Sequence, residues 1–246
     1  SITAHASITA LASITAHASI TANASIAPML HVDSLTFAYN SAPVLRGLSL
    51  RVERGETVVI RGASGCGKST LLRLLARLEA TPAGAVRLGG AEITGIPATA
   101  YRRRVAYLQQ LPVMATGSVR DNLLLPYRYG DDVPPNDETL RERLDAVDLG
   151  DVALGVSSSE LSIGQQQRVA LLRLRAMSPE LLLLDEPTAS LDDTSARRLL
   201  EAATTADGGE GASAPALIIV AHQELPLETP HRTLRMRDGV LEGETR

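Results

Sequence analysis

The sequence is nearly devoid of lysine, cysteine and long apolar runs. Its 246 residues include a single cysteine, and Lys68 is the only lysine among 24 lysines and arginines. One cysteine excludes an intramolecular disulfide, so we expect a reducing compartment. The longest apolar runs, 181–184 and 214–221, are too short to span a bilayer. We therefore expect a chain that is soluble on its own.

The charge balance is slightly acidic, with a formal net charge of -4 and a pI near 5.8. This balance provides no broad basic surface, so we expect no nucleic-acid partner. The one basic run, Arg102-Arg103-Arg104, is expected in a solvated loop or at a strand edge. An apolar content of 44% is enough for a core, in one large domain or two small ones.

The first residues are of low complexity. Residues 1–24 form four similar hexapeptides, and the composition changes at Ala27-Pro28. The segment lacks the basic region and the uninterrupted apolar stretch of a signal peptide. We interpret 1–28 as a leader or an appended tag without a functional role.

The lone lysine lies in Gly62-Ala63-Ser64-Gly65-Cys66-Gly67-Lys68-Ser69-Thr70, which matches the pattern G-x-x-x-x-G-K-[ST]. An ammonium is compact, whereas a guanidinium is a wide fork, and a backbone cradle around phosphates has room only for the ammonium. A β-branched run at 56–60 precedes the loop, and leucines 71, 72, 74, 75 and 78 follow at helical spacing. Strand, turn and helix are the setting that phosphate binding requires. We predict that the amides of 63–70 bind phosphate oxygens and that the Ser69 hydroxyl binds Mg²⁺. Cys66 is either a reactive thiolate or a small residue that fills space in the loop.

Polar residues follow two buried strands. The continuous apolar runs 181–184 and 217–220 are typical of parallel strands that are covered on both faces. Asp185 and Glu186 follow the first run, and His222 follows the second, at the edge where α/β sheets gather their ligands. We predict that Asp185 holds Mg²⁺ and that Glu186 accepts a proton from an attacking water.

The remaining patterns predict a β layer and a helical region. Residues 30–39 and 48–52 alternate like strands around a turn at 40–43, and 85–88 and 105–108 are short strands. Helical patterns occupy 118–125, 137–147 and 165–177. Ser162 and Gln165 form a capping box at the start of the last helix, and the free amides there make a second anion site.

Leu161-Ser162-Ile163-Gly164-Gln165, shortly before Leu-Leu-Leu-Leu-Asp-Glu-Pro, resembles the signature of an ABC-type ATPase, the nucleotide-binding subunit of ATP-binding cassette transporters. The resemblance covers 29–246. It implies an α/β fold: a P-loop NTPase, RecA-like core at 29–111 and 176–246 with an antiparallel β subdomain, and an inserted α-helical signature subdomain at about 112–175.

The resemblance also implies a role for each motif. By this resemblance, Tyr39 stacks on adenine, 62–70 is the Walker A loop, and Ser162, Gly164 and Gln165 form the signature. Gln110, favoured over Gln109 by its spacing, is the Q-loop glutamine, which acts in catalysis and at the metal. Asp185 is the Walker B metal ligand, Glu186 the catalytic base, Asp192 the D-loop aspartate and His222 the switch histidine. With Lys68, these residues are the candidate site.

The chain departs from the family pattern in two places. Ile163 stands where the first signature glycine is more common, so we expect slower hydrolysis from the added bulk and reduced backbone freedom. Ala221 and Gln223 flank His222, where the family commonly has a threonine and an aspartate. We therefore expect contacts other than the usual ones to orient His222.

The resemblance implies ATP and Mg²⁺ as cofactors and a head-to-tail dimer of two copies. It also implies a separate transmembrane permease that docks on Gln110 and 112–125, and hence a cytoplasmic location on the inner face of the membrane. We expect no appended domain after 240–242. A soluble ABC-type ATPase acting on DNA or ribosomes is the alternative; such proteins usually have two cassettes, a long coiled coil or zinc-binding cysteines. Residues 123–127 loosely resemble subunits assigned to iron or metal export, and substrate and transport direction stay open.

Overall fold

The computed structural model describes residues 28–82, 84–129, 132–206 and 213–245, so nearly all of the proposed leader lies outside the described residues. Its main element is a six-stranded sheet in the order β10-β9-β3-β8-β7-β6. The strands are β3 (Thr57–Arg61), β6 (Val105–Leu108), β7 (Leu181–Asp185), β8 (Ala216–Ala221), β9 (Arg232–Arg237) and β10 (Val240–Thr245). All neighbours pair in parallel except β9 and β10. The predicted α/β class with a parallel core is confirmed.

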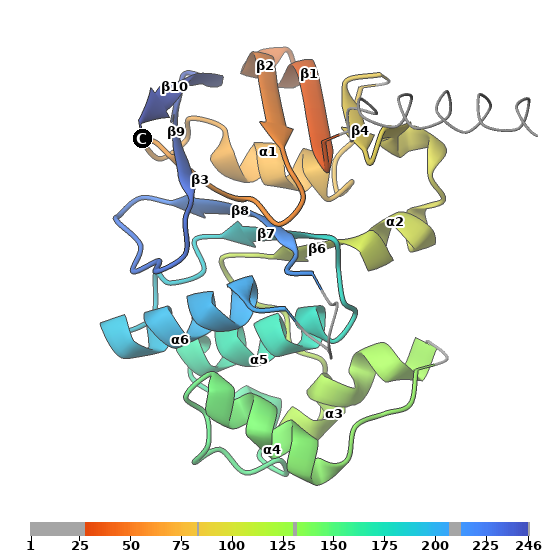
Figure 1. Ribbon diagram of the computed structural model, residues 1–246, viewed down its shortest axis with the longest axis vertical. Helices are drawn as coiled ribbons and strands as arrows, with labels where there is room; N and C mark the ends of the chain where they lie inside the picture. The colour runs from red at the N-terminus through yellow and green to blue at the C-terminus, as the bar shows by residue number, and fades with distance from the viewer. Residues whose placement is uncertain (1–27, 83, 130–131, 207–212, 246) are drawn as a thin grey trace, which may run out of the picture.

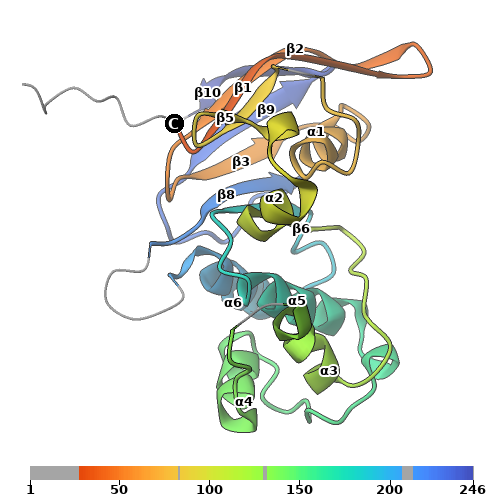
Figure 2. The same ribbon diagram turned by 90° about the vertical axis from the view of Figure 1, so that its right-hand side faces the viewer.

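The central strands are apolar throughout because helices cover both faces of the sheet (Figures 1 and 2). Leu181 and Leu183 pack with helix α1 (Lys68–Leu75). Leu182 and Leu184 point the other way, toward α5 (Ile163–Arg175) and α6 (Asp193–Thr204). Successive side chains of a strand face opposite sides, so a strand buried on both sides needs leucine at every position.

A second, antiparallel sheet packs over α1, in the order β2-β1-β4-β5. Its strands are β1 (Leu30–Tyr39), β2 (Ala42–Val52), β4 (Val86–Leu88) and β5 (Ala91–Glu92). Asn40 and Ser41 form the β1–β2 turn with φ of 46° and 69°, as a two-residue hairpin requires. The predicted bounds of β1 are confirmed. Strand β2 begins earlier than predicted and includes Pro43, which an edge strand tolerates.

Helix α1 is shorter than the leucine spacing predicts. Leu78, predicted as part of its apolar face, is 53% exposed and lies beyond the helix end. Arg77 adopts a left-handed conformation with φ of 53°, and its guanidinium donates to the Ile96 carbonyl at 2.6 Å and lies over the Tyr101 ring. These tertiary contacts stop the helix before the periodic pattern does.

The expectation of a loop or strand edge at 102–104 is wrong. These arginines form the last turn of helix α2 (Ala98–Arg104), where positive side chains complement the helix C-terminus. Arg104 also pairs with Glu180 at 2.5 Å. The helix buries only Tyr101, so its sequence carries no apolar period.

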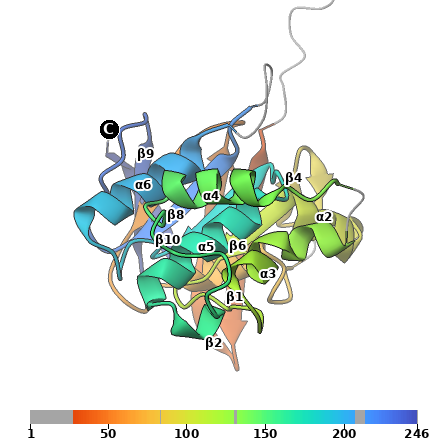
Figure 3. The same cartoon turned by 90° about the horizontal axis from the view of Figure 1, so that it is seen from below.

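The remaining helices gather on the side of the molecule away from the antiparallel sheet (Figures 1 and 3). Helices α3 (Val119–Leu124) and α4 (Asp137–Ala146) pack against α5 through Leu123, Leu140 and Val169. The described residues also form short 3₁₀ turns at Ile93–Gly95, Leu125–Tyr129 and Ser158–Glu160. Among the described residues, no helix combines the length and the apolar character needed to cross a membrane.

Candidate functional site

The glycine loop between β3 and α1 has no room for side chains at two of its glycines. A Cβ on Gly62 would lie 2.3 Å from the carbonyl oxygen of Met236, and one on Gly67 would lie 2.9 Å from Leu45. Gly65 and Gly67 have φ of 78° and 108°, which favours glycine. Gly67 starts α1 without a side-chain cap, so the first amides of the helix point into the loop.

Lys68 is held inside this loop. Its side chain is only 5% exposed, and Nζ donates to the carbonyl oxygens of Gly62 at 2.8 Å and Ala63 at 2.9 Å. The Sγ atom of Cys66 lies 3.9 Å away. A buried ammonium needs a counter-charge, and a phosphate in the loop would provide one. The residues present therefore fit a phosphate ligand.

Two of the three predicted metal ligands, Ser69 and Asp185, meet where β7 ends. Ser69 Oγ donates to Asp185 Oδ1 at 3.0 Å, and Asp185 is buried. A hydroxyl and a carboxylate supply the oxygen ligands that Mg²⁺ prefers, so this pair fits the ion.

Tyr107 is a residue of this site that the motifs do not predict. Its hydroxyl donates to Asp185 Oδ2 at 2.9 Å. Burial, and secondly the negative charge of Asp185, raise the pKa of Tyr107, so it stays a protonated donor. The contact depends on the register of β6 and β7, in which Tyr107 lies opposite Leu183.

Two of the three other predicted catalytic side chains, those of Gln110 and His222, contact Glu186. Gln110 Nε2 donates to Glu186 Oε2 at 2.9 Å, and His222 Nε2 lies 2.6 Å from Oε1. Of the two candidate glutamines, the side chain of Gln110 makes this contact, whereas Gln109 accepts from Gln167 through its backbone oxygen at 3.3 Å. The structure thus brings three residues of the predicted site together.

The backbone of Glu186 has φ of 48°, a left-handed conformation that costs a non-glycine residue about 1–2 kcal/mol. Its N–H donates to the Val220 carbonyl at 2.9 Å, which holds the turn after β7 against β8. Unusual backbone geometry of this kind clusters at functional sites.

Tyr39 ends β1 beside helix α1. Its ring meets Phe37 edge-on with the centroids 4.9 Å apart, and its hydroxyl donates to Glu79 at 2.8 Å. The side chains of Thr70 and Arg73 lie next to it. Burial, followed by the Glu79 contact, raises the pKa of Tyr39. The predicted adenine-stacking ring therefore stands next to the phosphate loop.

The signature residues form the start of α5. Ser162 Oγ accepts from the Gln165 N–H at 3.3 Å, and Gln165 Oε1 accepts from the Ser162 N–H at 2.9 Å, which is the predicted capping box. Ile163 is 49% exposed. A Cβ on Gly164 would lie 2.7 Å from Leu191 Cδ2, so this turn packs directly on the segment before α6.

Asp192 caps α6. Its Oδ1 accepts from the N–H groups of Thr194 and Ser195, both at 3.0 Å. These contacts, with that of Ser195 first, lower the pKa of Asp192. Helices α1 and α5 lie on opposite faces of the parallel sheet (Figures 1 and 2), so the signature turn is built apart from the phosphate loop of its own chain.

Comparison with known proteins identifies the family of this chain. A family model described as ABC transporter matches residues 45–189, more than half of the chain. The chain belongs to the ABC transporter family. It is an ABC-type ATPase domain, a module that binds ATP and whose ATP hydrolysis is coupled to transport in this family.

Two curated plant relatives are similar to this domain. Protein STAR1 of Oryza sativa subsp. japonica is 47% identical over 162 residues, which cover 65% of this chain and 46% of STAR1. ABC transporter I family member 17 of Arabidopsis thaliana is 42% identical over 176 residues, which cover 70% of this chain and 65% of that protein. The chain therefore matches less than two thirds of either relative's length.

The fold is also that of a solved ABC transporter. A bacterial Atm1-family ABC exporter with ATP bound aligns with a TM-score of 0.74 and 25% identity, over 89% of this chain and 39% of the exporter. This match confirms an ABC ATPase fold with a parallel core sheet and an antiparallel β subdomain.

The structure shows which contact orients His222 in a chain that has glutamine, and not aspartate, at position 223. Gln223 is exposed, and His222 contacts Glu186 directly. In this ABC ATPase domain, the carboxylate of Glu186 thus contributes to the orientation of the histidine.

Proposed function

We propose that this chain hydrolyses ATP to drive transport through a separate membrane subunit. The observation that carries the proposal is the cluster at the ends of β3, β7 and β8, where Lys68, Ser69 and Asp185 lie beside Glu186. It combines an anion cradle, a pair of oxygen ligands and a carboxylate base at one sheet edge.

Each group has a distinct task in this proposal. Lys68 and the loop amides bind the phosphates of ATP. Ser69, Asp185 and Gln110 would hold Mg²⁺, and the ion would neutralise phosphate charge. Glu186 orients a water molecule and accepts its proton. His222 lies close enough to Glu186 to steady the carboxylate. In this proposal it also supports the terminal phosphate of ATP.

A second copy of the chain completes the site. Phosphate-loop helix α1 and signature helix α5 occupy opposite faces of the sheet, so Ser162, Gly164 and Gln165 act on the nucleotide of the partner copy. The first amides of α5 carry positive partial charge and point out of the helix. In a head-to-tail dimer, each copy would present these amides to the phosphates bound by the other, beside Asp192 of the D-loop.

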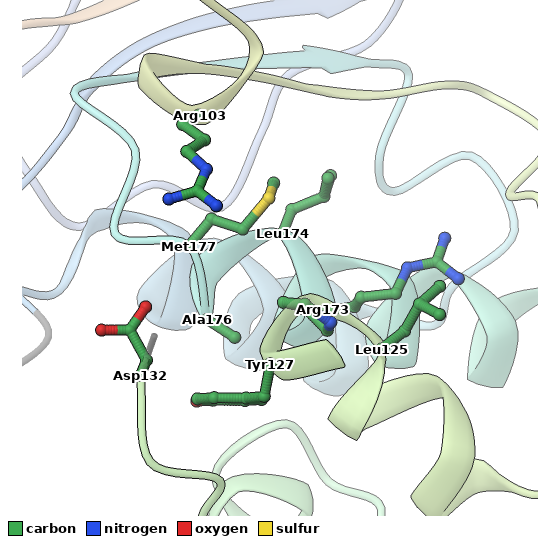
Figure 4. Close-up of a pocket in the computed structure, with 9 residues that line it drawn as sticks. Arg103, Leu125, Tyr127, Asp132, Arg173, Leu174, Ala176 and Met177 are labelled. Carbon is green, nitrogen blue, oxygen red and sulfur yellow. The ribbon is translucent and has the colours of Figure 1, made fainter. Parts of the chain in front are cut away.

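The membrane subunit docks on the predicted segment 112–125 and on a pocket that adjoins it at Leu125, between α2, the 3₁₀ turn Leu125–Tyr129 and the end of α5 (Figure 4). The pocket has a volume of about 330 Å³, with an apolar wall from Leu125, Leu174 and Met177. Leu111 and Val113, both exposed, belong to the neighbouring segment. An apolar helix of a membrane protein fits such a surface and would place this chain on the cytoplasmic, inner face of the membrane.

Glu186→Gln tests the proposed chemistry. The substitution keeps the shape of the side chain but removes the base, so ATP should still bind, hydrolysis should fall by about 10²-fold or more, and an ATP-bound dimer should accumulate. Single-turnover phosphate release and size-exclusion chromatography with ATP measure both effects. Glu79→Gln, near Tyr39, is the matched control and should leave hydrolysis near the parent rate. A Glu186→Gln enzyme that hydrolyses ATP at the parent rate would reject Glu186 as the base.

The membrane partner is tested by affinity purification from detergent-solubilised membranes. A polytopic membrane protein recovered with the chain supports the transporter proposal. Recovery with ribosomes or DNA-repair proteins instead would favour the soluble alternative.

A further inference from the structure

Asp148 follows helix α4 with φ of 58°, in the left-handed region that non-glycine residues seldom occupy. Its Oδ2 accepts from Arg168 Nη1 and from Ser195 Oγ, both at 3.1 Å. One carboxylate oxygen therefore joins the α4–α5 linker, helix α5 and helix α6.

Arg168 fixes the start of α5 to this linker. It is 8% exposed, and Nε donates to the Gly164 carbonyl at 3.3 Å. Nη1 donates to the carbonyls of Val147 at 3.0 Å and Asp148 at 2.7 Å. Over the described part of the chain, Asp148 is the one carboxylate in ion-pair range of this buried cation. A buried guanidinium depends on such a partner, so the pair constrains both segments.

Ser195 connects the pair to the cap of α6. It is 2% exposed, and its Oγ lies 3.1 Å from Asp148 Oδ2 and 2.9 Å from Asp192 Oδ2. A hydroxyl carries one hydrogen and donates it to one acceptor at a time. The Ser195 hydroxyl is thus shared between the linker carboxylate and the capping carboxylate.

The same two regions also touch directly. A Cβ on Gly164 would come within 2.7 Å of Leu191 Cδ2 and 3.0 Å of the Ser190 carbonyl. A close backbone contact and a polar chain therefore both link residues 162–165, the signature turn, to residues 190–192, the D-loop.

We propose that Asp148, Arg168 and Ser195 are positioning residues that make the signature turn and the D-loop one rigid unit. The inference rests on the proposed head-to-tail dimer, in which both segments face the nucleotide of the partner copy. When Asp192 engages the partner, the Ser195 hydroxyl donates to Asp148, and α6 stays tied to the linker. The signature turn and the D-loop thereby reach the partner copy at a fixed distance and orientation relative to each other.

Asp148→Gly tests this role without adding backbone strain, because glycine favours the left-handed conformation. We expect kcat to fall about tenfold, with KM and the Kd of ATP for the monomer within about twofold of the parent values, because the phosphate loop is untouched. ATP-dependent dimerisation in the Glu186→Gln background should weaken to a similar extent. Asp148→Asn keeps an acceptor oxygen in a conformation that asparagine tolerates but loses the charge that pairs with Arg168, so kcat should fall less than in Asp148→Gly.

A control variant separates the backbone effect from the polar chain. Ser34→Gly, in the antiparallel sheet, also replaces a residue of left-handed conformation, with φ of 48°, by glycine and so relieves the same backbone strain. This variant should leave kcat unchanged. Parent-like kcat and dimerisation in Asp148→Gly would overturn the inference, and so would an equal loss in Asp148→Asn.

A double-mutant cycle gives the second test. Ser195→Ala should lower kcat about threefold, and adding it to Asp148→Gly should cause little further loss, because both changes interrupt one chain of contacts. Independent structural damage would give additive losses, and that result would reject the inference. A parent chain that neither hydrolyses ATP nor dimerises with it would overturn the proposed function itself, and the inference with it.

Discussion

The phosphate side of this domain, formed by the glycine loop and the end of β7, and the signature side, formed by the starts of α5 and α6, differ in the burial of their polar side chains. On the phosphate side, Lys68 at the start of α1 and Asp185 at the end of β7 are buried and contact groups of their own chain. On the signature side, Ser162 and Asp192 are exposed caps of helices. The phosphate loop thus satisfies its polar groups within one chain, whereas the helix starts at Ser162 and Asp192 are open to solvent, as the proposed contact with a second copy requires.

We expect the largest effect from Lys68→Arg, which keeps the positive charge but widens the head group of the side chain. The buried cradle of two carbonyls has no room for a guanidinium, so we expect ATP binding to weaken and hydrolysis to fall by about 10²- to 10³-fold. Titration with a fluorescent ATP analogue measures the binding. Arg87→Lys, the reverse change at an exposed position of β4, is the control and should have no effect. Parent-like affinity in the Lys68→Arg enzyme would show that the cradle does not select the ammonium.

A smaller effect is expected at Tyr107, where Phe removes only the hydroxyl that donates to Asp185. Groups that orient a metal ligand are worth about 10- to 100-fold in metal affinity, so the Mg²⁺ concentration for half-maximal hydrolysis should rise at least about tenfold. A Mg²⁺ titration at saturating ATP measures this rise. Tyr127→Phe, whose hydroxyl accepts from Arg143, leaves the metal site intact and is the control. An unchanged Mg²⁺ requirement in Tyr107→Phe would remove Tyr107 from the site.

The smallest effect is expected on the signature side, from Ile163→Gly. Removing this half-exposed side chain gives closer approach and more backbone freedom, worth up to about 1 kcal/mol, so hydrolysis should rise about two- to fivefold. The affinity of the monomer for ATP should not change, because Ile163 lies outside the phosphate loop. Steady-state hydrolysis and monomer binding are measured in parallel, with Ile163→Leu as the bulk-retaining control. Slower hydrolysis by the Ile163→Gly enzyme would contradict the expected slowing by Ile163.

Much of the phosphate side is predictable from sequence because short, local patterns determine it. The glycine loop at 62–70, the apolar strand with its polar residues at 181–186 and the one at 217–222 are each a single contiguous stretch. The Tyr107–Asp185 contact joins residues that are 78 positions apart and depends on strand register, which no local pattern specifies.

Elements with few buried apolar residues escaped prediction. Helix α2 buries only Tyr101, and β9 alternates around just Leu234 and Met236. Their positions are set by tertiary contacts, such as Arg104 with Glu180 and the pairing of β9 with β3. Helix α6 was not predicted either, although Ala196, Leu199 and Leu200 form a buried face whose helical spacing is visible in the sequence.

The lone lysine also gives the protein a built-in spectroscopic probe. Protein grown with ¹⁵N-lysine carries one labelled backbone amide, at the first residue of α1. Its single resonance reports on the phosphate loop without mutation, dye or spectral assignment. Occupancy of that loop, in the free chain or in a large membrane complex, is thereby readable from one peak.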